Sequence, residues 1–199
     1  MTIAGSGSAS AKAGSAAPTV APSTVATSTD QRPIPAPGNR SAVDAWAQWR
    51  LEYKAAKAQL GDTRVQLLQA TPVGADGKVN LVRDRGMVTA NFVAAGAKLG
   101  VPSDKKCGVS RSHIRDISVE NDVFVDGCVR WYRFPRCTIA EIWTRAKAAG
   151  ADASMPANIT YYGTWGFRQG STDYDFKDDC GLAVEATDAA GSGSGSAAP

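Results

Sequence analysis

The stretch CVRWYRFPRCTIAEIWTRAKAAG, residues 128–150, carries the clearest structural signal in the sequence. In its first half arginines alternate with aromatic and aliphatic residues, and its second half has the features of a helix. Thr138 followed by Glu141 is a capping box, and Gly150 is a residue type that ends helices. Arginine beside large aromatic rings is the combination that single-stranded nucleic acid binding uses. The stretch therefore predicts either such a site or an ordinary buried helix with solvated arginines.

The two ends of the chain differ in composition from its middle. Residues 1–40 and 186–199 consist mainly of Ala, Gly, Ser, Thr and Pro, which bury too little apolar surface to offset the entropy lost on ordering. We therefore expect a flexible N-terminal arm (1–40), one core domain (41–185) and a flexible C-terminal tail (186–199). The net charge is only +3, but basic residues outnumber acidic ones in residues 105–150, and acidic ones outnumber basic ones in residues 151–199. The basic middle is suited to a polyanion.

Apolar periodicity predicts two further helices. Trp46, Trp49, Tyr53 and Leu60 repeat at helical spacing, with packing on the same domain or on a neighbouring subunit as the alternatives, and residues 87–99 have the pattern of a second helix. Strand signals are shorter: residues 79–82 as part of a hairpin, one or two strands within 114–125, and the alternating segment 158–168. The expected fold is α+β, a helix-rich single core domain with a small β-hairpin component.

Few residues of the sequence are candidates for catalysis or metal binding. Cys107, Cys128, Cys137 and Cys180 form no CxxC pair, and the N-terminus lacks the apolar run of a secretory signal. Reduced thiols are therefore favoured, although two disulfides are compatible with the count. The single His113 has no partner fixed by spacing, and no motif for a serine hydrolase, phosphate-binding loop or zinc protease occurs. We expect no enzyme, no cofactor, no metal, no small-molecule substrate and, without ~20 consecutive apolar residues, no membrane span.

Several short motifs occur in one order in the second half of the chain: Gly100-Val101-Pro102-Ser103, then Arg133 with Ala140 and Ile142-Trp143, then Met155-Pro156-Ala157-Asn158, then Tyr174-Asp175-Phe176. Together they resemble the coat proteins of flexuous filamentous plant viruses, the potexvirus and potyvirus group. Those families have a helix-rich core and a Ser, Arg and Asp trio at the genomic RNA. The resemblance implies that Ser103, Arg133 and Asp175 form the RNA site here, with Asp175 holding the guanidinium of Arg133.

The resemblance implies a function for the whole chain. It would be a non-enzymatic coat protein, found in the virion and the host cytoplasm, that self-associates into a helical homopolymer around single-stranded RNA. Arg130 and Arg136 would be auxiliary RNA contacts. The alternative from another class is a nucleic-acid-free virion module, of the phage decoration or connector type, that binds other capsid or tail proteins; native disulfides would favour it. An internal Arg–Asp ion pair without a ligand is the structural alternative for Arg133 and Asp175.

Overall fold

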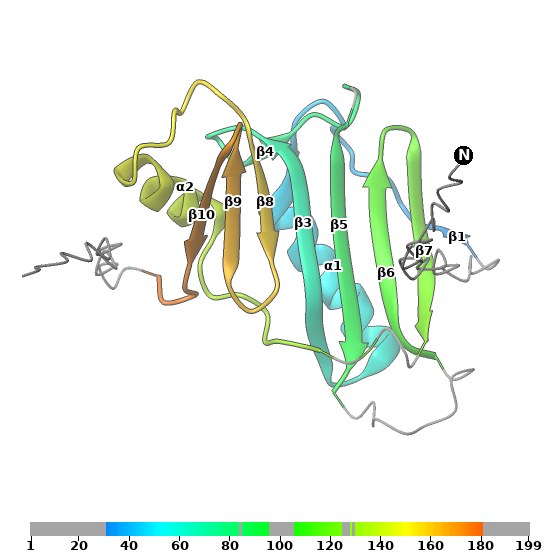
Figure 1. Ribbon diagram of the computed structural model, residues 1–199. Coiled ribbons are helices and arrows are strands. Elements are labelled where there is room, and N and C mark those ends of the chain that lie inside the picture. Colours follow the sequence, from blue (N-terminus) through cyan, green and yellow to red (C-terminus); the bar gives the residue numbers. More distant parts are fainter. Residues whose placement is uncertain (1–30, 84, 96–105, 125–127, 129, 181–199) are drawn as a thin grey trace, which may run out of the picture.

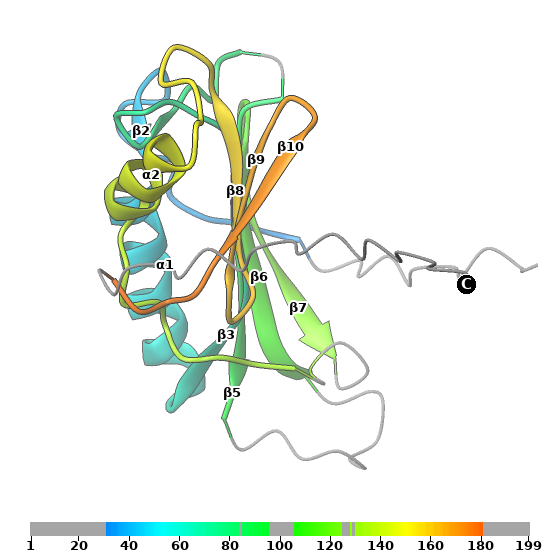
Figure 2. The ribbon, with the colours of Figure 1, turned by 60° about the vertical axis from the view of Figure 1, so that its left-hand side comes forward.

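The structure, a computed structural model, describes residues 31–83, 85–95, 106–124, 128 and 130–180. Within these residues the chain forms one antiparallel sheet of ten strands and two helices, α1 (Ala45–Leu60) and α2 (Ile139–Ala148). Both helices lie on the same face of the sheet, as Figure 2 shows from the side. No described helix covers the opposite face, which is turned toward the viewer in Figure 1. We call it the open face.

The longest strand, β3, has strands on both sides of it in the sheet. Their order across the sheet is β1 (Arg32–Pro33), β7 (Ile117–Phe124), β6 (Lys106–Ile114), β5 (Met87–Ala94), β3 (Thr63–Val73), β8 (Ala157–Tyr161), β9 (Trp165–Gln169) and β10 (Thr172–Phe176). Two short strands, β2 (Val43–Asp44) and β4 (Lys78–Val79), pair with each other, and β4 also pairs with β3. The strand β1 lies inside the predicted arm and extends the sheet beyond β7.

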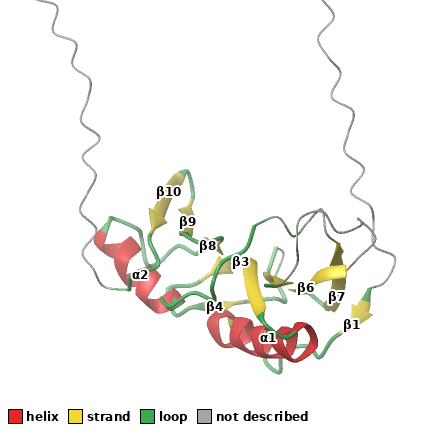
Figure 3. Ribbon diagram, turned by 90° about the horizontal axis from the view of Figure 1, so that it is seen from below, coloured by secondary structure: helices red, strands yellow, loops and turns green. Residues whose placement is uncertain are grey.

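The hydrophobic core lies between the sheet and the two helices. Its residues are the ones that point toward the helices where side chains alternate along the strands. On β3, Val65, Leu68, Ala70 and Val73 are buried, while the residues between them are half-buried. The same alternation occurs on β9, where Trp165 and Phe167 point into the core. Because successive side chains of a strand point to opposite faces, the remaining residues lie on the open face. Seen from below in Figure 3, the helices form a single layer against the sheet.

Both helices begin at capped residues. Asp44 accepts a hydrogen bond from the Ala47 amide (2.9 Å) at the start of α1. The capping box predicted at α2 is confirmed, since Thr138 Oγ1 accepts from the Glu141 amide and Glu141 Oε2 accepts from the Thr138 amide. Each such cap contributes about 1 kcal/mol. The helix predicted around Trp46–Leu60 is likewise confirmed as α1. Neither described helix is long and apolar enough to cross a membrane.

The predicted helix-rich core is wrong, and the fold is mostly β. The largest error concerns residues 87–99, predicted as a helix, whose first part is strand β5. Val88, Ala90 and Phe92 point into the core with period two, and β5 is hydrogen-bonded on both sides, to β3 and β6. The predicted strand over 158–168 is confirmed, but as two strands, β8 and β9, joined by a turn in which Gly163 has a φ of 95°.

The expectation of reduced thiols is also wrong. All four cysteines form disulfides, Cys107 with Cys128 and Cys137 with Cys180. The first bridge ties the segment after β7 to the start of β6, and the second ties the segment after β10 to the start of α2. Disulfides of this kind persist in oxidising surroundings, so the pair points to an oxidising location.

Candidate nucleic-acid interface

The middle of the open face is polar and uncharged. The strand register places hydroxyl and amide side chains beside one another in a row that crosses the sheet and ends at a carboxylate: Ser112, Thr89, Gln69, Thr160, Gly166 and Asp175. A second row contains Asn121, Ser110 and Asn91, in which Ser110 Oγ donates to Asn91 Oδ1 (2.7 Å). Such side chains offer hydrogen bonds in both directions without charge. The face can therefore hold a polar ligand by many neutral contacts.

A group of arginines and a tryptophan lies at one end of this face. Tyr132 exchanges two backbone hydrogen bonds with Val65 (2.6 and 2.8 Å), so the segment around Tyr132 runs beside the first residues of β3. Tyr132 and Phe134 pack against the core. By alternation Trp131 and Arg133 point to the open face. Both are exposed.

Arg64, which alternates with the buried Val65 on β3, completes this group. Its guanidinium carbon lies 5.7 Å from the centroid of the Trp131 ring, which is within the range of a cation–π contact. The Trp131 side chain nevertheless remains 44% exposed. We call Arg64, Trp131 and Arg133 the Arg–Trp corner. It combines a flat aromatic surface with two guanidinium groups, and the exposed Arg130 adjoins it in the chain.

The open face also contains a hollow of about 400 Å³, most of whose lining belongs to β8, β9 and β10. Its floor is Gly166 on β9, and its walls include Thr160, Tyr162 and Asp175. The lining is completed by Gln69, Asn158, Phe167, Arg168, Asp173 and Tyr174. A carbon in place of the Gly166 hydrogen would lie 2.6 Å from Thr160 Oγ1. The missing side chain at Gly166 thus forms the hollow, which has the size of a small-ligand site.

The predicted RNA-binding residues lie in different places. Arg133 belongs to the Arg–Trp corner, Arg130 is exposed next to it, and Asp175 lines the hollow. Among the described residues no hydrogen bond or ion pair joins Arg133 to Asp175. Arg136 lies just before α2, where its backbone amide donates to Asp178. Ser103 lies outside the described residues.

Sequence reasoning missed Arg64 and did not include Trp131 in the site. Arg64 lies near the start of β3, which was not predicted as a strand from the sequence, and nothing local relates it to residue 131. Only the pairing of Val65 with Tyr132 brings the two side chains together. The interleaved aromatic and basic residues of 128–136 were the available signal for Trp131.

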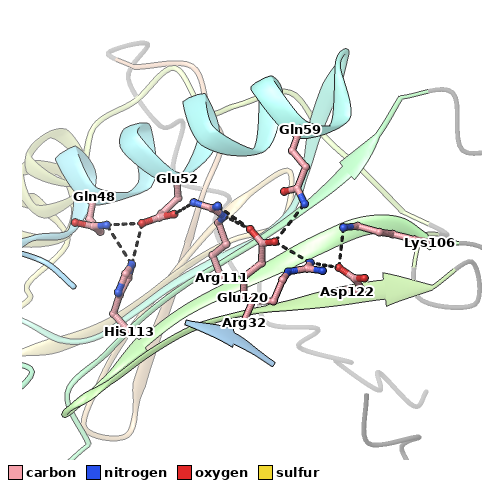
Figure 4. A network of polar contacts seen from close by, with 9 residues as sticks. All are labelled: Arg32, Gln48, Glu52, Gln59, Lys106, Arg111, His113, Glu120 and Asp122. Atoms are coloured by element: carbon pink, nitrogen blue, oxygen red, sulfur yellow. Dashed lines mark hydrogen bonds and ion pairs between the residues drawn. The ribbon is translucent and has the colours of Figure 1, made fainter. Parts of the chain in front are cut away.

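A second concentration of charge lies on the covered side of the sheet, between α1 and strands β6 and β7 (Figure 4). Arg111 of β6 contacts Glu52 of α1 (Nη1–Oε2, 2.5 Å) and Glu120 of β7 (Nη2–Oε2, 2.6 Å). Arg32 of β1 contacts Glu120 (2.8 Å) and Asp122, and Lys106 contacts Asp122 (2.7 Å). We call this set the buried network, and it joins β1, α1, β6 and β7.

The buried network shifts the pKa values of its carboxylates. Burial by itself would raise the pKa of Glu52, but hydrogen bonds from His113 and Arg111 and the charge of Arg111 together outweigh it and hold that pKa below 4.5. The pKa of Glu120 is lowered in the same way, with burial opposed chiefly by hydrogen bonds from Arg111 and Gln59. These carboxylates are therefore ionised at neutral pH, and their charges are compensated within the fold.

The same region contains a Ser–His–Glu relay, so we considered it as a catalytic centre. Ser118 Oγ lies 2.9 Å from His113 Nδ1, and Glu52 Oε1 lies 2.9 Å from His113 Nε2. His113, however, is fully buried, and Gln48 contacts the same ring nitrogen (3.1 Å). A hollow beside α1 is lined by Glu52 and Arg111, but neither His113 nor Ser118 lines it. A nucleophile needs access to its substrate, so we interpret the relay as part of the buried network.

Comparison with known proteins gives no relative: no family model, no curated protein and no solved structure matches the chain.

Proposed function

We propose that this chain is a non-enzymatic coat protein that binds single-stranded RNA on the open face of its sheet, with the Arg–Trp corner as the main contact. The observation that carries the proposal is the contact between Arg64 and Trp131 beside the exposed Arg133. Base stacking on an exposed aromatic ring contributes about 1–3 kcal/mol per base and tolerates any sequence. The exposed guanidinium of Arg133 can hold a phosphate beside the ring, whereas the guanidinium of Arg64 is already paired with Asp62 (Nη1–Oδ1, 3.0 Å).

The rest of the open face supports the same proposal. Hydroxyl and amide groups along β3, β5 and β6 can donate to or accept from bases and ribose hydroxyls, as on the sheets of other RNA-binding modules. Asp175 is left out of the proposed contact, because a free carboxylate repels phosphate. A coat protein also needs only modest affinity per subunit, since many subunits bind one strand.

The coat role and helical assembly come from the resemblance described above, and they are proposals on that basis. The helix-rich core that the resemblance also implied is contradicted by the sheet.

The alternative function, a virion module that binds other virion proteins and no nucleic acid, is favoured by two observations. The first is the presence of two disulfides. The second is an apolar corner of the sheet, where Ile114 and Ile117 lie opposite each other at the β6–β7 turn and are 39% and 58% exposed. Neighbouring exposed aliphatic residues are typical of protein-binding surfaces.

The deciding experiment measures binding of a fluorescent single-stranded RNA oligonucleotide by anisotropy at several salt concentrations. Trp131→Ala should weaken binding about 5- to 100-fold with little change in salt dependence, because stacking releases no counterions. Arg133→Ala should weaken binding and lower the slope of log K against log salt by about 0.7, the value for one phosphate contact on a single strand. The backbone carbonyl of Arg133 that accepts from Tyr161 is retained in this variant.

Matched controls separate the corner from general surface effects. Phe124→Ala removes an aromatic residue of similar exposure, 40% against 44% for Trp131, at the end of β7. Arg50→Ala removes an exposed arginine from α1, on the covered side of the sheet. Neither should change RNA affinity as much as its partner variant does. Equal effects within each pair would contradict the proposal, and absence of RNA binding by the unmodified protein would favour the protein-binding alternative.

A further inference from the structure

The hollow around Gly166 contains polar groups that the fold does not use. Among the described residues, the side chains of Gln69, Thr160 and Asp175 have no hydrogen-bond or ion-pair partner. Each of them lines the hollow. Gln69 and Thr160 are half-buried and Asp175 is exposed, and polar groups that the fold leaves unpaired bond to water in the free protein. Three unused groups around one concave site are therefore available to a ligand.

The Tyr162 ring lies at the edge of the same hollow. Its Cε1 atom lies 3.9 Å from the position that a side-chain carbon on Gly166 would take, and Asp175 Oδ1 lies at the same distance from that position. The Tyr162 side chain is 46% exposed. The floor thus brings a ring and a carboxylate within reach of one small molecule. An aromatic ring supplies an apolar surface, while its hydroxyl stays in water.

The charges in the hollow exclude several classes of ligand. Arg168 is paired with Asp173 (Nε–Oδ1, 2.5 Å), so its charge is locally compensated. Asp175 then leaves the hollow with an excess negative charge, which disfavours phosphates and carboxylates. The amide and hydroxyl lining disfavours an apolar ligand, because these groups would lose their hydrogen bonds to water without replacement.

We propose that the hollow around Gly166 binds a neutral pyranose saccharide. A sugar ring has adjacent hydroxyl groups that can donate to one carboxylate, here Asp175, and accept from amide and hydroxyl donors, here Gln69 and Thr160. The apolar C–H face of the ring can pack on Tyr162. This site goes beyond the proposed RNA binding and does not depend on it, since no residue of the Arg–Trp corner lines the hollow.

The test is a titration of the full chain, with its disulfides intact, followed by backbone amide NMR shifts. The probes are the methyl pyranosides of glucose, galactose and mannose and also N-acetylglucosamine. We expect at least one of these sugars to shift the amide signals of Thr160, Gly166 and Asp175. Asp175→Ala should weaken that binding at least tenfold, because a hydrogen bond to a charged group is lost. Asp116→Ala, which changes an exposed aspartate in the β6–β7 turn, should leave it unchanged.

The outcomes are distinct from those of the RNA experiment. Asp175→Ala should leave RNA affinity unchanged, so either proposal can fail alone. No amide shift with any of these sugars would overturn the saccharide site, as would binding that persists in both Asp175→Ala and Tyr162→Ala. Tighter binding of the cation spermidine than of every sugar, with shifts of the same amides, would also overturn it, because the hollow would then be a cation site.

Discussion

Replacing Arg111 with methionine tests whether the buried network stabilises the fold. Methionine keeps much of the side-chain length but removes the charge that contacts Glu52 and Glu120. The side chains of the three residues are 14%, 7% and 5% exposed. Removing one partner of a buried ion pair costs about 3–5 kcal/mol, because the remaining charge is left uncompensated.

The expected magnitude lies at the low end of that range. Glu52 keeps His113 and Gln48 as partners, and Glu120 keeps Arg32 and Gln59. We therefore expect Arg111→Met to lower the free energy of unfolding by about 3 kcal/mol at pH 7. This corresponds to a factor of roughly 100 in the ratio of folded to unfolded protein.

The pH dependence gives a second criterion. Glu52 and Glu120 have pKa values below 4.5 in the folded protein, so they bind fewer protons than in the unfolded chain. Their contribution to stability is therefore complete above pH 4.5 and is lost as the pH falls through the folded pKa values. Without Arg111, burial would raise both pKa values, and the variant would lose less stability on acidification. The difference between the two proteins should shrink between pH 7 and about pH 3.5.

The assay is urea unfolding followed by tryptophan fluorescence, with the disulfides intact, at both pH values. Arg64→Met is the control, because Arg64 pairs with the exposed Asp62 (Nη1–Oδ1, 3.0 Å) and such surface pairs contribute at most about 1 kcal/mol. The reasoning is refuted if Arg111→Met is no less stable than Arg64→Met at pH 7. It is also refuted if the loss caused by Arg111→Met is the same at both pH values.

Two further predictions concern the covalent and local restraints. Replacing both cysteines of a bridge with serine should lower the free energy of unfolding by about 4 kcal/mol for Cys137–Cys180 and about 3 kcal/mol for Cys107–Cys128. The two values differ because the entropy of loop closure grows with the sequence separation, which is 43 for the first bridge and 21 for the second. The reverse order in urea unfolding would contradict the loop-entropy account. Thr138→Ala should cost about 1 kcal/mol by removing the cap of α2, and a stability equal to that of the unmodified protein would show that the capping box contributes nothing.

Local signals in the sequence were sufficient for the two helices. The capping box is formed by Thr138 and Glu141, which are three residues apart in the sequence. The apolar face of α1 follows from the helical spacing of its own apolar residues. Neither needs information about the rest of the fold. The turn at Gly163 was not predicted, because the apolar alternation continues across the glycine and residues 158–168 have the pattern of a single strand.

The strand β5 could not be assigned from the same kind of signal. Phe92 and Val93 are adjacent and both buried, which breaks the alternation expected of a half-exposed strand. Val93 packs on the disulfide between Cys107 and Cys128 at the open face, so the second buried position results from a distant contact. Over a short segment, the apolar pattern of a helix and the apolar pattern of a strand with both faces partly covered are then the same.

The partners in the buried network were equally hidden. Arg111 contacts Glu52 across 59 positions, and Arg32 contacts Glu120 across 88. The charge distribution along the chain suggested a basic region facing a polyanion, but Arg111 belongs to that region and is neutralised inside the fold. A count of basic residues therefore overstates the charge available to RNA.

The separation of charges between the two faces decides what the molecule can bind. On the covered side, the carboxylates Glu52, Glu120 and Asp122 hold their cations, so these groups stabilise the attachment of α1 and β1 to the sheet. On the open side, the exposed Arg133 and the free Asp175 lie in different regions, one beside an exposed tryptophan and the other in a hollow beside a tyrosine. If Arg133 and Asp175 bound one ligand together, Arg133→Ala and Asp175→Ala would both weaken the binding of that ligand. Because the fold separates them, we expect Arg133→Ala to affect only RNA and Asp175→Ala only the saccharide.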